Sequence, residues 1–317
     1  MLNIVVQRHG AHSETLSLFV ELLERNCLIF YPTDDLVVSH EKFISTHYGI
    51  RFIKTFAEMI SIIESTSHHG SLIFNTASEM TEDWAAPLLK AWHGTEVVYH
   101  HERTRFERAG LVQIFAHPFV DPNAYLLPVA DVVESLVGRD PTPCHIATVV
   151  LPNWTRESHL RNKNLNLLSR YLQSADPAKF RFVMTGMSLN IMNAALAAVA
   201  NSPRVEVMHQ LDLRALASLL RKDRTYVLPL NHPNGRYVRE GLTGTIPLAI
   251  NCGCPLVVSR QVAEIYEIGS WVDEDGLLSE LPDDADAYRS RIEMTSVDRT
   301  LILKKNKLRF DTLISGV

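Results

Sequence analysis

The sequence predicts an α/β protein built from two parallel sheets, each with helices on both faces. Three observations lead to this fold class. Apolar, strand-like segments alternate with amphipathic, helix-like segments along most of the chain. The stretch Gly138–Pro143, rich in Gly and Pro, divides this alternation into two similar sets. The length of 317 residues suits two domains of about 100–200 residues each.

The first set predicts an N-terminal Rossmann-like domain over residues 1–140. It opens with an apolar strand at 2–7. A helix at 14–25 follows, because its apolar side chains recur with helical spacing on one face. Strands and helices then alternate, with strands at 27–31, 71–75, 96–100, 111–116 and 125–129, and helices at 56–65 and 84–91.

The second set predicts a C-terminal Rossmann-like domain over residues 141–280. Its strands are expected at 145–151, 180–185, 205–208, 226–230 and 255–259, and its helices at 165–173, 190–200, 213–221 and 245–252. Residues 281–317 are expected to form a tail, with a helix at 301–314, that packs back on the N-terminal domain. Two doubly wound domains of this kind would face each other across a cleft, where such folds bind ligands.

Composition restricts the function. The net charge of −5 provides no global basic field for nucleic acid, and no basic stripe carries interleaved aromatic residues. Cys252 and Cys254 lack a companion Cys pair, so we expect free thiols in a reducing compartment and no metal site. The N-terminus has no apolar signal region and no apolar run reaches about 18 residues, so a cytoplasmic protein without a transmembrane segment is expected.

The segment 226–259 has the strongest functional signal. It reads as strand, polar glycine-rich loop, short helix and strand, and the helix begins in Thr243-Gly244-Thr245 and stops at Gly253. A helix that starts in this way directs unpaired backbone N–H groups and the positive end of its dipole toward the loop. Gly244 permits close approach of a ligand, and Pro247 is tolerated in the first turn. The segment therefore favours a bound phosphate or diphosphate, although a well-capped helix in any Rossmann-like fold would look similar.

At this point the second half resembles the nucleotide-binding domain of GT-B glycosyltransferases, most closely the retaining group 4 type (glycosyl transferases group 1). Four segments occur in the expected order over residues 145–270: NWTRESHLRNKNLNLL from 153, RFVMTG ending at 186, VEVMHQL from 205, and the strand–loop–helix–strand of 226–259. The first half matches in pattern only. The family signature carries two glutamates, of which Glu240 falls on the first, whereas Leu248 occupies the second position.

The resemblance implies a set of site residues. In the family, an arginine and a lysine hold the donor diphosphate, and the signature segments surround the nucleotide. The positions that would bind the nucleotide sugar are Arg156, Lys163, Gly186, Leu211, Asn231, Thr243, Gly244 and Thr245. The positions proposed for catalysis are His101, Glu102, His12 and Glu240. His12 and His101 each follow a strand of the first domain, where histidine can act as a base or donate a hydrogen bond.

Each of these side chains also has a plain structural interpretation. Arg156 and Glu240 could be solvated surface residues, and with 14 histidines in the chain any one of them could be structural. Asn231 lies just after a predicted strand and would face the cleft if the topology is correct.

We therefore expect a metal-independent glycosyltransferase, a hexosyl- or pentosyltransferase, that retains anomeric configuration. It would need no cofactor, with a nucleotide-diphosphate sugar as co-substrate, and the acceptor would be a glycan, a lipid or a small molecule. Leu248 motivates an alternative, a catalytically inactive GT-B protein that serves as a binding or scaffold subunit. A nucleotide-sugar epimerase is a third interpretation.

Overall fold

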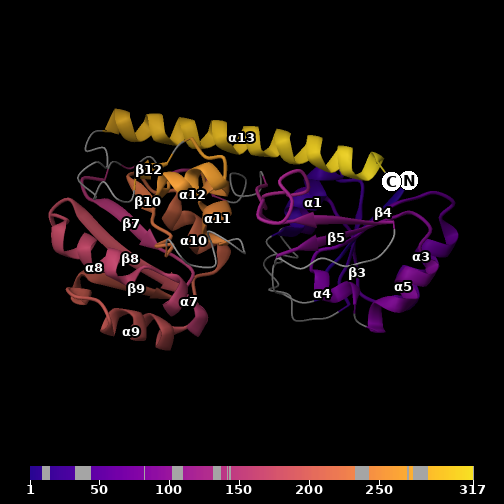
Figure 1. The fold of residues 1–317 in the computed structure, drawn as a ribbon, viewed down its shortest axis with the longest axis horizontal. Helices are drawn as coiled ribbons and strands as arrows, with labels where there is room; N and C mark the ends of the chain where they lie inside the picture. The colour runs from indigo at the N-terminus through magenta and orange to yellow at the C-terminus, as the bar shows by residue number, and fades with distance from the viewer. Residues whose placement is uncertain are drawn as a thin grey trace. The chain divides into compact units, whose positions relative to one another are not determined.

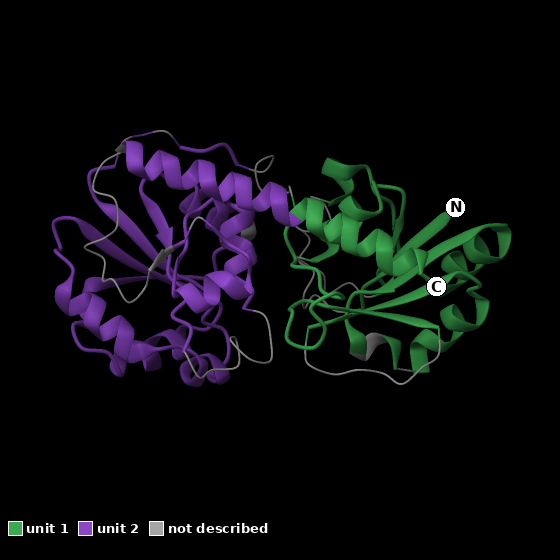
Figure 2. Ribbon diagram, turned by 45° about the horizontal axis from the view of Figure 1, so that its top comes forward, with its two compact units in different colours: residues 1–130, 303–317 green, residues 131–302 purple. Residues whose placement is uncertain are grey.

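The protein is described from a computed structural model (Figure 1). The structure describes residues 1–8, 15–32, 44–81, 83–101, 110–130, 137–140, 142, 144–232, 243–269, 271–273 and 285–316. The chain divides into two compact units (Figure 2). Unit 1 comprises Met1–Ala130 and Leu303–Val317, and unit 2 comprises Asp131–Ile302.

Unit 1 contains a six-stranded sheet with the order β3-β2-β1-β4-β5-β6. Every neighbouring pair is parallel. The strands are β1 (Leu2–Val6), β2 (Leu28–Phe30), β3 (Phe52–Ile53), β4 (His69–Phe74), β5 (Thr95–His100) and β6 (Leu111–Phe115). Val, Ile and Leu dominate these strands, as expected of parallel strands buried on both faces.

Short helices connect the strands of unit 1. They are α1 (Leu16–Leu22), α3 (Phe56–Ser65), α4 (Ala77–Met80), the 3₁₀ turn η2 (Asp83–Ala85) and α5 (Ala86–Ala91). Thr55 caps α3 by accepting a hydrogen bond from the Glu58 N–H, which satisfies one of the donors left open at a helix start. One side of the sheet packs its core against α3 and α5, with Ile63, Leu88 and Trp92 among the buried residues.

Unit 2 repeats the same strand order. Its four-stranded parallel sheet has the order β10-β7-β8-β9, and an isolated parallel bridge from Val227 to Leu256 places β11 beside β10. With the β11–β12 pair included, the order reads β9-β8-β7-β10-β11-β12. The strands are β7 (Ala147–Leu151), β8 (Phe180–Gly186), β9 (Val205–His209), β10 (Thr225–Val227), β11 (Val257–Val258) and β12 (Val272–Asp273). Each unit therefore shows the 3-2-1-4-5-6 order of the dinucleotide-binding doubly wound fold.

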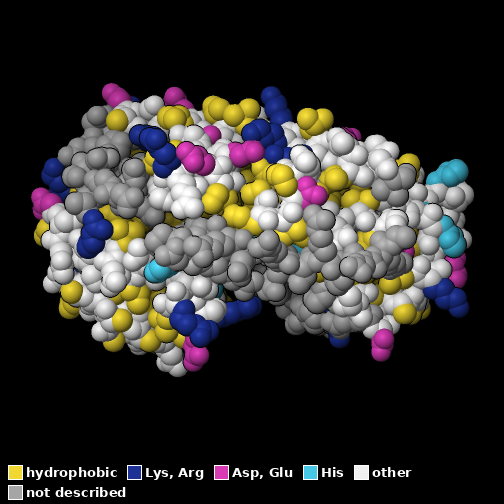
Figure 3. All heavy atoms as spheres, viewed as in Figure 1, with side chains coloured by type: hydrophobic (Ala, Val, Ile, Leu, Met, Phe, Trp, Pro, Cys, Tyr) yellow, Lys and Arg dark blue, Asp and Glu magenta, His cyan; other side chains and the backbone are white. Residues whose placement is uncertain are grey.

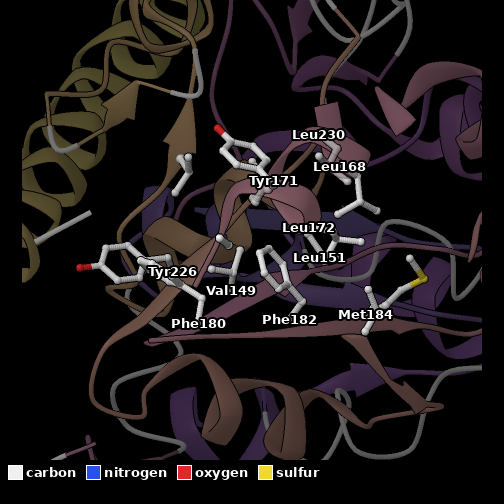
Figure 4. Close-up of a cluster of buried hydrophobic side chains, with 14 of the residues drawn as sticks. Val149, Leu151, Leu168, Tyr171, Leu172, Phe180, Phe182, Met184, Tyr226 and Leu230 are labelled. Atoms are coloured by element: carbon white, nitrogen blue, oxygen red, sulfur yellow. The ribbon is translucent and has the colours of Figure 1, made fainter. Parts of the chain in front are cut away.

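The helices of unit 2 are α7 (Glu157–Asn162), α8 (Leu165–Ser174), α9 (Leu189–Ala197), the 3₁₀ turn η3 (Ser202–Arg204), α10 (Leu213–Leu220), α11 (Thr245–Asn251) and α12 (Arg260–Ile265). Figure 4 shows the main core, in which Leu168, Tyr171 and Leu172 of α8 pack toward Val149 and Phe182 of the sheet. Fully burying one such side chain contributes about 1.5–3 kcal/mol.

A long C-terminal helix, α13 (Ala285–Ser315), contributes to both units. In unit 2, the Tyr288 hydroxyl accepts a hydrogen bond from the Thr225 N–H at 3.1 Å. In unit 1, the buried Asn306 side chain pairs with both backbone groups of Leu127, accepting from its N–H at 3.2 Å and donating to its carbonyl at 2.7 Å. The helix is much longer than the predicted segment 301–314.

Other elements also differ from the sequence prediction. The expected strand at 125–129 is absent, because only Tyr125 forms an isolated bridge, to Phe115. β3 and β12, together with α7 and α12, were not predicted. The cysteines are free, as expected, but only Cys252 and Cys254 are fully buried, while Cys27 and Cys144 are half-buried.

The described surface carries mixed charge. On the face shown in Figure 3, Lys and Arg side chains are interspersed with Asp and Glu side chains. Within the described ranges, none of the helices combines the length and apolar character needed to cross a membrane.

Candidate functional site

The strand order defines one topological switch point in each unit. In unit 2, this point lies between β7 and β10, because the chain proceeds from β7 toward β9 on one side and from β10 toward β12 on the other. Ligands of open α/β sheets bind outside the carboxyl ends of the strands at such a point. The segments that follow β7 and β10, residues 152–156 and 228–232, therefore frame the candidate site.

Lys163 lies at this switch point. Its Nζ donates hydrogen bonds of 2.9 Å to the Pro152 carbonyl after β7 and of 2.9 Å to the Pro229 carbonyl after β10. It also lies 4.9 Å from the centroid of the Trp154 ring. An ammonium group has three N–H donors, so one is left for a further acceptor.

The Lys163 side chain is buried, with 5% of the residue exposed. Burial lowers the pKa of its ammonium from 10.5 to about 7. The two carbonyl oxygens and the Trp154 face stabilise the charged form and offset part of this cost. An anion placed beside the third N–H would stabilise the charge further and raise the pKa again.

Asn231 lies beside Lys163, and the two residues form an isolated antiparallel bridge. The neighbouring Asn164 N–H donates to the Leu230 carbonyl at 2.7 Å, and the His232 N–H donates to the Asn162 carbonyl at 3.1 Å. Only 3% of Asn231 is exposed, and among the described residues neither its side-chain oxygen nor its side-chain nitrogen has a hydrogen-bond partner. The structure thus brings together Lys163 and Asn231, two of the residues predicted to bind the nucleotide sugar.

The backbone at this edge of unit 2 is strained. Asn153 after β7, Gln210 after β9 and Leu230 after β10 all have a positive φ, at 68°, 54° and 57°. Residues other than glycine adopt this left-handed region at a cost, and such residues cluster where a structure positions a ligand.

His159 adds a further polar group near Lys163. Its buried ring accepts a hydrogen bond through Nδ1 from the Thr155 N–H at 3.1 Å, with the Arg156 N–H at 3.4 Å. Burial, together with the positive charges of Lys163 and Arg156, lowers the pKa of His159 from 6.5 to about 4. The ring is therefore neutral at pH 7, and because Nδ1 accepts, its proton resides on Nε2.

Arg156 precedes α7 as its N-cap residue, and it is exposed. Its charge and that of Lys163 both act on His159, so two positive charges lie near this neutral ring after β7. This position agrees with a diphosphate ligand and equally with a solvated arginine.

Gly186 and Leu211 shape the same edge through the backbone. A Cβ atom at Gly186 would lie 2.3 Å from the Trp154 carbonyl oxygen, so only glycine lets the loop after β7 approach the end of β8. The Gly186 carbonyl accepts from the Gln210 N–H at 3.0 Å, which fixes the segment leading to the half-buried Leu211.

The turn Thr243–Thr245 opens α11. Gly244 is exposed, and no described atom lies within 4 Å of a Cβ atom built on it. Within the described part of the chain, the main-chain N–H groups of Gly244 and Thr245 have no acceptor. The buried Thr245 hydroxyl has no hydrogen-bond partner there either. These two N–H groups are therefore available as donors, as the phosphate interpretation requires. The described hydrogen bonds do not join this turn to Lys163.

Two arginines donate hydrogen bonds to backbone carbonyls at the C-terminal end of α11. Gly253 has φ 61°, which ends the helix, and its carbonyl accepts from Arg139 at 2.6 Å. The Cys252 carbonyl accepts from Arg221 at 3.3 Å. These cations lie at the negative end of the helix dipole and satisfy carbonyls that the helix leaves open.

Unit 1 also carries a polar cluster at its switch point, between β1 and β4. Gln7, Thr15 and Asn75 are buried, with at most 1% exposed. The Asn75 side chain donates to the Gln7 side-chain oxygen and accepts from the Thr15 hydroxyl at 2.6 Å. His101, after β5, lies 3.1 Å through Nε2 from the Asn75 carbonyl oxygen. A carbonyl only accepts, so Nε2 carries a proton and donates this hydrogen bond.

Several predicted residues lie outside the described part of the structure. They are His12, Glu102 and Glu240. Leu248, where the family signature has its second glutamate, is half-buried on α11.

Sequence reasoning missed His159 and the Gln7–Thr15–Asn75 cluster. His159 stands four residues before Lys163 on a short helical segment, and this spacing could have indicated that the two side chains share a face. The polar residues directly after strands β1 and β4 could likewise have indicated the cluster. Over the described ranges, no three His, Cys, Asp or Glu side chains gather to form a metal site.

Comparisons with known proteins point to one fold. No protein-family model matches the chain, and no curated protein matches its sequence significantly. The structure of HepE from Anabaena, solved with UDP and glucose, is similar at a TM-score of 0.60 and 12% identity, over 98% of each chain. AviGT4, a glycosyltransferase involved in avilamycin A biosynthesis, has a TM-score of 0.59 at 12% identity, over 100% of this chain and 99% of its own.

A candidate UDP-N-acetylglucosamine 2-epimerase from Listeria monocytogenes is also similar, with a TM-score of 0.50 and 12% identity over 98% of this chain and 97% of its own. These likenesses confirm the predicted fold: the chain has two parallel α/β sheets in the GT-B arrangement of elements. The fold neighbours include glycosyltransferases, and at such identities the likeness concerns the fold alone.

Proposed function

We propose that this chain is a glycosyltransferase that moves a sugar from a nucleotide-diphosphate donor to a hydroxyl acceptor. The observation that carries this proposal is the buried Lys163 ammonium, which lies across the carboxyl ends of β7 and β10 with one N–H left for an acceptor. The GT-B fold and the nucleotide-bound HepE neighbour support it.

The chemistry follows from the charge that develops during transfer. When the bond from the sugar to the diphosphate breaks, negative charge accumulates on the leaving phosphate, and preorganised donors stabilise it. Lys163 and the open N–H groups at Gly244 and Thr245 supply such donors, with Arg156 contributing from the surface. In this proposal these groups stabilise the leaving diphosphate without a metal ion, and the family resemblance suggests retention of configuration.

His101 in unit 1 is the proposed contact to a reacting hydroxyl. The Nε2–H group of its ring faces the Asn75 carbonyl, which orients the imidazole. The acceptor substrate is a glycan, a lipid or a small molecule.

Binding of UDP and GDP, measured by titration calorimetry, tests the proposal. The wild type should bind at least one of them, and Lys163→Met should bind it about tenfold or more weakly, because a charge-assisted hydrogen bond is lost. Arg161→Ala is the matched control, since this exposed arginine on α7 changes the charge of the same helix without contributing to the switch point. Equal losses in both variants, or no binding by the wild type, would contradict the site.

Turnover separates the alternatives. Release of the nucleotide from UDP-glucose or GDP-mannose indicates a transferase or hydrolase activity. Binding without any turnover favours the inactive GT-B subunit that Leu248 motivates, because leucine supplies no carboxylate at the second signature position. Interconversion of nucleotide sugars without an acceptor would instead indicate an epimerase.

A further inference from the structure

The side chain of Asn231 is one of several in unit 2 whose polar atoms are buried without a hydrogen-bond partner among the described residues; the hydroxyls of Thr225, Tyr226 and Thr245 are others. Both of its amide atoms are buried without a hydrogen-bond partner. Buried amides in folded proteins almost always have a partner, because leaving one unsatisfied lowers stability. The unsatisfied amide therefore requires a reason.

Two neighbouring features suggest that the reason is a ligand. Leu230, the preceding residue, has a positive φ of 57°, so backbone strain and the unsatisfied amide occur side by side. Asn231 is also bridged to Lys163, which has a donor available at the switch point. Unfavourable features concentrated at one point are typical of a site whose partner is a bound molecule.

The chemistry of the amide defines which part of a ligand it fits. An asparagine side chain offers two N–H donors and a carbonyl acceptor. Phosphate oxygens of a nucleotide diphosphate only accept, so they cannot satisfy the Asn231 oxygen, whereas a sugar hydroxyl both donates and accepts. Lys163 suits the anionic part of the same ligand.

We propose that Asn231 is a specificity-determining residue that binds an uncharged, hydrogen-bond-donating group of the ligand, of which a sugar hydroxyl is the clearest example. This assignment rests on the proposed transferase function. The amide lies next to Leu230, whose backbone is in the left-handed region.

Asn231→Leu tests this assignment, because leucine has a similar size and no polar atoms. Without ligand, the variant should unfold at a temperature about 2–4 °C higher than the wild type, since an unsatisfied amide has been removed. Asn75→Leu is the matched control. Asn75 is equally buried but paired with Gln7 and Thr15, so its replacement should lower the unfolding temperature.

The binding measurement uses UDP-glucose or GDP-mannose, whichever binds the wild type, and inorganic pyrophosphate. Asn231→Leu should weaken nucleotide-sugar binding about tenfold while leaving pyrophosphate binding unchanged. Asn231→Ala is measured in parallel and should show the same loss of affinity.

The possible outcomes distinguish the assignment of Asn231 from the proposed function. A lower unfolding temperature for Asn231→Leu would show that the amide is satisfied in solution, for example by water, and would overturn the assignment. Unchanged nucleotide-sugar affinity in the variant would overturn the assignment but leave the proposed function intact. Failure of the wild type to bind any nucleotide sugar would overturn both.

Discussion

The two switch points have the same topology and differ in how their polar groups are satisfied. In unit 1, Asn75 follows β4, and its side chain is paired with Gln7 and Thr15. In unit 2, Asn231 follows β10, the strand at the equivalent place in the sheet, and its side chain has no hydrogen-bond partner in the described part of the chain. Unit 1 thus completes the hydrogen bonds of this cluster from its own chain, whereas unit 2 leaves them incomplete.

The two units also differ in buried charge and in backbone strain near their switch points. Unit 2 buries the Lys163 ammonium at its switch point, while the Gln7–Thr15–Asn75 cluster of unit 1 is neutral. The strained residues Asn153, Gln210 and Leu230 follow strands of unit 2, whereas the described positive-φ residues of unit 1 do not directly follow its strands. The buried cation is the reason why our proposal places the anionic part of the ligand in unit 2.

Gly186→Ala should have the largest effect on this comparison. A Cβ atom would collide with backbone atoms of Trp154, which cannot move aside as a side chain can. We expect a loss of about 3 kcal/mol in the free energy of unfolding, measured with urea. Gly244→Ala is the control and should be close to neutral, because described atoms leave space there. Similar losses in both variants would contradict the described packing.

The buried Lys163 ammonium of unit 2 should make the free energy of unfolding depend on pH. In the unfolded chain the pKa of Lys163 is 10.5, whereas burial lowers it to about 7 in the folded protein. Between these values the unfolded chain binds more protons, so the free energy of unfolding rises with pH, by at most about 1.4 kcal/mol per pH unit. Below pH 7 both states are protonated and the contribution is constant.

Urea unfolding at pH 7, 8 and 9 measures this slope. Lys163→Met should remove it, while the exposed-site variant Arg161→Ala should keep it. A slope that is identical in wild type and Lys163→Met would show that the ammonium does not titrate in this range.

Arg156→Ala should have the smallest effect. The side chain is exposed, so stability should stay within about 0.5 kcal/mol of wild type. Its charge near Lys163 should strengthen binding of a nucleotide diphosphate by about twofold to fivefold at low salt, and less at high salt. Titrations at two salt concentrations measure this difference, and a salt-independent loss would assign Arg156 a closer contact.

Patterns in the sequence predicted long, periodic elements well and short ones poorly. The helix at 56–65 was predicted with its observed bounds, because its apolar residues recur regularly and Thr55 caps it. The two-residue strands β3 and β12 and the short helices α7 and α12 are too brief to establish a period, so tertiary contacts decide them. The first half of α13 was missed because polar residues interrupt its apolar pattern.

Some features of the candidate site could also be predicted from the sequence, whereas others could not. The resemblance predicted Lys163, the end of a strand predicted Asn231, and the glycine-rich segment predicted Gly244, because these predictions depend on local order along the chain. The sequence could not reveal that the Lys163 ammonium binds the Pro152 and Pro229 carbonyls, since residues 66 positions apart meet only in the folded sheet. The burial of Asn231 and the neutral state of His159 likewise depend on contacts that form only when the chain folds.

A crystal structure with the tightest-binding nucleotide diphosphate tests the central claim most directly. The account predicts a phosphate oxygen within hydrogen-bond distance of Lys163 Nζ, at the carboxyl ends of β7 and β10. A diphosphate bound instead at the switch point of unit 1, or with Lys163 bonded to the Pro152 and Pro229 carbonyls alone, would contradict it.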